Sequence, residues 1–105
     1  MKKGDAVILV MKKCLLANRE LGDKMYACRV VQYDVKREVL YLALENDTLS
    51  AISLDAIYEC NIKEEKDVVS CTGRIRERYE NQHGKIIKLE IKSGFYKISV
   101  NSVDK

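Results

Sequence analysis

Apolar and polar residues alternate with a period of two in short blocks along most of the chain, and polar clusters separate the blocks. Such alternation is typical of strands that have one face on a core and the other in solvent. The pattern predicts strands over residues 6–10, 25–33, 38–44, 52–62, 68–79, 86–92 and 94–100. The sequence therefore predicts a mainly β fold, an antiparallel barrel or sandwich.

The connections between these strands use polar residues rather than proline, which is absent. Strands 68–79 and 86–92 form the clearest hairpin, and Gly84 in its turn suits a positive φ. The last strand either stands alone or extends 86–92 past a kink. Strand 52–62 is expected to have an irregularity near Leu54-Asp55-Ala56. Residues 12–24 fit a short helix and a long hairpin arm equally well, so both alternatives stay open.

The length of 105 residues corresponds to one domain, residues 1–105, and a hydrophobic share of 47% is enough for a core. The formal net charge of +3 is far from that of a strong nucleic-acid binder. The apolar runs are too short to span a bilayer, and no cleavage site follows the charged N-terminus. These features predict a cytoplasmic protein that does not insert into membranes.

The four cysteines are widely spaced, and the chain holds one histidine, His83. Because no close ligand pair is present, free thiols in a reducing compartment are favoured over disulfides or structural zinc. The sequence therefore predicts no metal and no cofactor.

Catalytic signatures are missing from the sequence. His83 falls in a predicted turn, away from any nucleophile, and no phosphate-loop, dinucleotide or zinc-protease motif is present. We expect no catalytic residues and a protein that is not an enzyme. An enzyme that uses a cysteine thiolate is the alternative from that class, and it would require a rapidly labelled thiol.

Arginines at alternate positions mark strand 68–79. Arg74, Arg76 and Arg78 are predicted to share one face, with Lys88 beside them across the hairpin if Ile75 faces the core. Such a row of forked donors suits the carboxylates of a protein partner or the phosphates of a nucleotide. The structural interpretation is a solvated outer face whose arginines pair with acidic residues across the hairpin, Glu90 or Glu80.

Aromatic residues raise the alternative of a small barrel that binds RNA or single-stranded DNA, because bases stack on exposed rings. Their dispersal weakens that interpretation, since most tyrosines fall at apolar positions of the alternation. The residues concerned are Tyr26, Tyr33, Tyr41, Tyr58, Tyr79, Phe95 and Tyr96.

Four short segments, in order, resemble the N-terminal domain of the YcgR-type flagellar brake proteins, the PilZ-associated PilZN domain. The segments are Gly4-Asp5 with Val7 and Leu9, Tyr26-Ala27-Cys28-Arg29-Val30-Val31, Leu40-Tyr41-Leu42, and Cys71-Thr72-Gly73-Arg74-Ile75. The resemblance implies a small split β-barrel. In the relatives, this domain precedes a PilZ domain that binds cyclic di-GMP and acts on flagellar rotation or exopolysaccharide output.

The nucleotide motifs of those relatives are not reproduced in their context. Arg74 and Arg78 spell RxxxR, but they fall inside a predicted strand, and no DxSxxG motif follows. Direct binding of cyclic di-GMP is therefore not expected. We expect an all-β, antiparallel split barrel of six to seven strands that acts through protein contacts. A PilZ-domain or motility protein is the expected kind of partner, and self-association through exposed strand edges is a further option.

Overall fold

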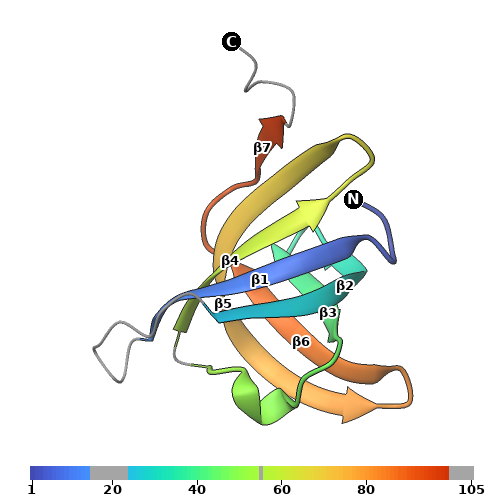
Figure 1. Ribbon diagram of the computed structural model, residues 1–105, viewed down its shortest axis with the longest axis vertical. Coiled ribbons are helices and arrows are strands. Elements are labelled where there is room, and N and C mark those ends of the chain that lie inside the picture. The colour runs from blue at the N-terminus through green and yellow to red at the C-terminus, as the bar shows by residue number, and fades with distance from the viewer. Residues whose placement is uncertain (15–23, 55, 100–105) are drawn as a thin grey trace.

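The computed structural model describes residues 1–14, 24–54 and 56–99, and strands make up most of it, with almost no helix (Figure 1). This confirms the predicted all-β fold. The elements are β1 (Ala6–Cys14), β2 (Lys24–Asp34), β3 (Val39–Leu44), the short 3₁₀ helix η1 (Leu49–Ala51), β4 (Ala56–Lys63), β5 (Asp67–Asn81), β6 (Gly84–Ile91) and β7 (Tyr96–Ser99). Most of the segment for which helix and hairpin stayed open, 12–24, lies outside the described residues, but both of its ends are strand.

The strands form one antiparallel sheet in the order β4-β1-β2-β3-β6-β5-β7, and pairing of β4 with β5 closes it. The result is a closed six-stranded barrel with β7 added beside β5 (Figure 1). Strand β5 is 15 residues long. Its first half pairs with β4 and β7, and its second half pairs with β6. The second half therefore has β6 as its only strand neighbour among the described residues.

Three bulges interrupt the ladders formed by the described residues. They lie between Met11 and Lys13 on β1, between Val30 and Gln32 on β2, and at Arg76 on β5. A bulge bends its strand and increases the local twist, which helps a small sheet to close on itself. Each bulge also shifts the alternation of inward and outward side chains by one residue.

The barrel interior is filled by residues from all six strands, as the period-two pattern requires. Fully buried members include Val7, Leu9, Cys28, Leu40, Leu42, Ile52, Tyr58, Cys60, Ile62, Cys71, Ile87 and Leu89. Ser70 is the one buried polar residue of the described chain, and its hydroxyl donates to Asn61 Oδ1 at 2.5 Å. The core is otherwise apolar, which is the main source of stability for so small a domain.

The predicted strand 52–62 is too long at its start. Strand β4 begins at Ala56, residues 52–54 lie outside any strand, and the short helix η1 comes just before them. Ile52 is fully buried and belongs to the core cluster, so the chain passes under one end of the barrel before β4 begins. The apolar character of this segment comes from capping the barrel rather than from a strand.

The last strand is separate from β6. Ser93 and its neighbours form a break, and the amide groups of Lys92 and Ser93 both donate to the carbonyl of Thr72, at 2.8 and 3.3 Å. Strand β7 then pairs with the beginning of β5. The turn between β5 and β6 contains Gly84 at φ +114°, as predicted. In the described residues, no helix is long and apolar enough to cross a membrane.

Candidate functional site

The bulge at Arg76 separates the three arginines that the sequence places on one face. Arg74 lies opposite Glu90, and Ile75 lies opposite Leu89. After the bulge, Arg78 lies opposite Ile87, which is a core residue. Arg74 and Arg78 therefore occupy opposite faces of β5, and the prediction of a single arginine row is wrong. The extra residue at the bulge reverses the alternation.

Arg78 is used to hold the end of the barrel. Its guanidinium donates to the carbonyl oxygen of Ile52, on the segment that passes under the barrel. Lys85, on the same side of the hairpin, donates from Nζ to the carbonyl of Asp47 at 2.6 Å. Two long side chains from β5 and β6 thus tie down residues 47–53, which we call the barrel cap.

Two core tyrosines bind the barrel cap from inside. The hydroxyl of Tyr26 donates to the carbonyl of Ala51 at 3.1 Å, and the hydroxyl of Tyr58 accepts from the amide of Ser53 at 2.9 Å. Their rings pack with centroids 6.4 Å apart. The barrel cap is therefore fixed through backbone groups, which a sequence pattern cannot reveal.

Four other basic residues lie on the outer side of the β5–β6 hairpin. We define the basic face as Arg74, Arg76, Lys88 and Lys92 together with the carboxylates of Glu77 and Glu90. Arg76 Nη1 lies 3.3 Å from Glu90 Oε1, and Lys92 Nζ lies 3.2 Å from the same oxygen. The ion pair of Arg76 with Glu90 is one of the contacts across the hairpin that the structural interpretation of the sequence expects.

Glu90 is the central acceptor of the basic face. The hydrogen bond from Lys92 lowers the pKa of the Glu90 carboxyl below its ordinary value, and the nearby charges of Lys92, Arg76 and Arg74 act in the same direction. Glu90 therefore stays ionised at neutral pH and orients the surrounding cations. Four cations share two carboxylates, so the basic face has an excess of positive charge.

Lys88 lies on this face as predicted, because Ile75 faces the core and is buried. Its Nζ is 3.9 Å from Glu77 Oε1 and 6.0 Å from the ring centroid of Tyr41 on β3. The distance to the ring is at the outer limit of a cation–π contact. Lys88 thus links the basic face to the neighbouring strand.

The aromatic residues do not form one exposed row in the described part of the chain. Tyr26 and Tyr58 are buried, and Tyr33 packs edge-on against Phe95 with centroids 5.3 Å apart. Tyr79 and Tyr96 are exposed, but they lie on different strands. A platform for stacked bases requires several rings on one face.

Three cysteines, Cys28, Cys60 and Cys71, are free and buried in the core. Burial raises the pKa of the Cys28 thiol to about 12. Cys60 lies opposite Cys71 across β4 and β5, and their hydrogen bond together with burial raises the pKa of the Cys60 thiol. Cys28 and Cys60 are therefore protonated at neutral pH and are poor nucleophiles. The side chain of Cys14 lies outside the described residues.

His83 lies at the exposed tip of the β5–β6 turn, where its amide donates to Asn81 Oδ1 at 2.8 Å. It contacts Gln82 through its ring and lies on a different element from the buried thiols. Within the described ranges, no cluster of histidine, cysteine and carboxylate side chains has the arrangement of a metal site.

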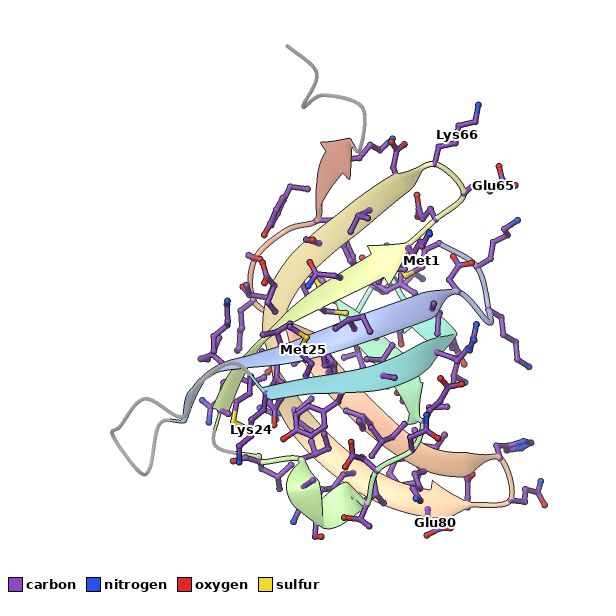
Figure 2. The ribbon with its side chains drawn as sticks, viewed as in Figure 1. Met1, Lys24, Met25, Glu65, Lys66 and Glu80 are labelled. Carbon is purple, nitrogen blue, oxygen red and sulfur yellow. The ribbon has the colours of Figure 1, made fainter. Side chains whose placement is uncertain are left out.

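A second surface feature is a hollow of about 660 Å³ between the N-terminal turn and the β4–β5 turn. Its lining carries both signs of charge. The cations are Lys2, Lys63, Lys66 and the N-terminal ammonium group of Met1, and the carboxylates are Asp5, Glu64, Glu65 and Asp67. Figure 2 places Met1, Glu65 and Lys66 around this end of the molecule. Because the charges are balanced, the hollow favours no ligand of one sign.

Comparison with known proteins assigns no relative: no family model, no curated protein and no solved structure matches the chain. The resemblance to the PilZN domain thus stays a prediction.

Proposed function

We propose that this chain is a non-enzymatic binding module that acts through protein contacts, with the basic face as its docking site. The observation that carries the proposal is the arrangement around Glu90, where Arg74, Arg76 and Lys92 converge on one carboxylate. Exposed guanidinium groups held in this way present unused donors to an incoming acidic side chain. The expected partner segment is acidic.

The rigidity of the hairpin supports this proposal. Arg74 and Arg76 project from a strand whose inner side is packed in the core through Ile75, so their positions are set before a partner arrives. Preorganised side chains lose less conformational entropy on binding than side chains of a mobile loop. The site therefore suits recognition of a protein surface.

The resemblance to the PilZN domain suggests the setting, which is cyclic di-GMP signalling in bacterial motility or surface behaviour. The opposite orientations of Arg74 and Arg78 support the expectation that cyclic di-GMP does not bind directly through this RxxxR pair. A PilZ-domain or motility protein with an acidic surface is the proposed partner. The cytoplasm is the compartment in which such a contact would form.

The test is a titration of the ¹⁵N-labelled protein with a short polyglutamate peptide, cyclic di-GMP and an oligouridylate, each in its own experiment. We expect the peptide to shift amide resonances of β5 and β6. The double variant Arg74→Gln, Arg76→Gln should bind it about fivefold more weakly or worse. The matched control is Lys63→Gln, Lys66→Gln, which removes two charges at the opposite end of β5.

Several outcomes would contradict the proposal. Equal weakening by both double variants would show that net charge, rather than the basic face, attracts the peptide. Binding of cyclic di-GMP that depends on Arg74 would make the chain a nucleotide receptor. Tighter binding of the oligouridylate, with a steep decrease as salt increases, would favour the alternative of a nucleic-acid-binding barrel.

A further inference from the structure

The second half of β5 has an open edge. Pairing with β4 ends at Arg74, and residues 76–81 are all exposed. Among the described residues, this part of β5 pairs with β6 alone. In Figure 1 the β5–β6 arm reaches beyond the strands beside it. An edge of this kind presents unpaired backbone N–H and C=O groups, which are a template for another strand.

The backbone groups that point outward are fixed by the hairpin register. Asn81 and Gly84 are paired on either side of the two-residue turn. The residues next to such a turn exchange their hydrogen bonds with each other, and hydrogen-bonded pairs alternate with non-bonded pairs along an antiparallel ladder. The backbone groups of Arg78 and Glu80 therefore point away from β6, toward the open edge.

We propose that this edge pairs with the same edge of a second copy of the chain, around a twofold axis at Tyr79. Such an axis is perpendicular to the sheet, so side chains that lie on one face of the first copy lie on the same face of the joined sheet in the second copy. Two residues that face each other across the axis therefore differ in number by an even amount. With Tyr79 on the axis, Arg78 of each copy faces Glu80 of the other. The pairing forms two sets of backbone hydrogen bonds and two opposite-charge contacts.

The neighbouring registers are disfavoured by charge. An axis at Arg78 would place two arginines directly opposite each other, and an axis at Glu80 would do the same with two glutamates. An axis at Glu77 would oppose two glutamates and also place Arg76 against Arg78. Like charges that face each other across strands are destabilising. Charges on an edge strand usually prevent pairing, but here their alternating sign selects a single register.

The surface beside the edge also fits this arrangement. A hollow of about 450 Å³ lies along Arg76–Tyr79 and is bounded by Leu54 on the other side. Leu54 and Tyr79 are both 39% exposed. In the register with Tyr79 on the axis, Gln82 of one copy lies opposite Arg76 of the other, next to this hollow. Pairing thus covers two apolar side chains that the single chain leaves in water.

Orientation of the charged side chains is compatible with the pairing. Glu80 lies at the outer margin of the hairpin arm in Figure 2. Arg78 uses one nitrogen to bind the carbonyl of Ile52, and its guanidinium keeps further donors for a carboxylate. The edge shares Arg76 and Glu77 with the basic face. The inference does not depend on the proposed function, because the pairing is made by backbone groups and by the contacts of Arg78 with Glu80.

The experiment is sedimentation velocity across a wide concentration range. We expect the unmodified chain to reach twice its 12.1 kDa mass. The variants Arg78→Glu and Glu80→Arg each place like charges at both contacts, so each should weaken the dimer about tenfold or more. An equimolar mixture of these two variants again places opposite charges at both contacts, and it should form a heterodimer.

Controls separate this result from unfolding and from net charge. Glu65→Arg and Lys66→Glu make the same charge changes at the β4–β5 turn and should leave the dimer intact. Circular dichroism checks that every variant is folded. A monomer at all concentrations would overturn the proposal, and so would dimers that persist in both variants. A folded mixture that stays monomeric would also exclude the register with Tyr79 on the axis.

Discussion

The guanidinium of Arg78 on β5 donates a hydrogen bond to the backbone carbonyl of Ile52, more than twenty residues earlier in the chain. This contact joins the hairpin to the barrel cap. It also explains why Arg78 takes no part in the basic face, although the sequence places it in line with Arg74 and Arg76. A charged donor thus binds the backbone carbonyl of a residue that lies outside the strands.

Removing this donor should destabilise the protein. We expect Arg78→Met, which keeps the apolar stem, to lower the free energy of unfolding by about 1 to 2 kcal/mol, because the carbonyl of Ile52 loses a charged donor. Urea denaturation at low protein concentration measures the change. The control is Arg76→Met, whose ion pair with Glu90 is exposed and should contribute much less to stability. Equal effects of the two variants would contradict a specific role for Arg78.

The barrel cap supplies a second prediction. Ile52 is fully buried, whereas Leu54 two residues later is 39% exposed. We expect Ile52→Ala to lower the free energy of unfolding by about 2 to 4 kcal/mol, since it removes buried methyl groups and leaves a cavity at the barrel end. Leu54→Ala should cost much less in the monomer. Thermal and urea unfolding of the two variants provide the measurement, and similar losses would show that Ile52 does not fill the barrel end.

The sequence pattern predicts the strands well where one face is buried and the ladder is regular. It overextends β4 because the apolar residues of the barrel cap, Ile52 among them, continue the alternation of residues 56–62. Alternation of apolar and polar residues indicates which side chains are buried. In the sequence, residues buried in the barrel cap give the same pattern as residues buried in a strand. Tertiary contacts such as those made by Tyr26 and Tyr58 decide the difference.

The arginine row fails for a related reason. A bulge adds one residue to a strand, and no particular residue type marks it in the sequence. The side chains that follow it therefore lie on the opposite face from the one that simple alternation predicts. One signal was present, because Glu77 interrupts the row of core positions on β5. A charged residue at a predicted core position indicates that the register has changed. With the bulge placed at Arg76, the pattern separates Arg74 from Arg78 as the structure does.

The close approach of β5 and β6 predicts that Gly73 cannot be replaced by a larger residue without loss of stability. A Cβ added to Gly73 on β5 would lie 2.3 Å from the backbone oxygen of Glu90, and backbone cannot move aside as a flexible side chain would. We expect Gly73→Ala to lower the free energy of unfolding by about 2 kcal/mol or more. Gly94→Ala is the matched control, because an added Cβ there meets nothing within 4 Å. Urea midpoints of the two variants should differ clearly, and a neutral Gly73→Ala would contradict the observed strand spacing.

The buried thiol of Cys28 predicts how stability changes in alkaline solution. Burial, aided by the charges of Glu45 and Asp47, raises its pKa from 9.0 to about 12. Between these values the unfolded chain loses the proton while the folded chain keeps it. The contribution of Cys28 to stability is therefore complete below pH 9 and is lost as the pH rises toward 12, by about 1.4 kcal/mol per pH unit.

Other groups also titrate in this range, so the comparison needs the variant Cys28→Ala, which lacks this thiol. Urea denaturation at successive pH values should show the unmodified chain losing its advantage over Cys28→Ala above pH 9. A difference in unfolding free energy that stays constant from pH 8 to pH 11 would contradict this prediction. It would mean that the thiol has the same pKa in the folded and the unfolded chain.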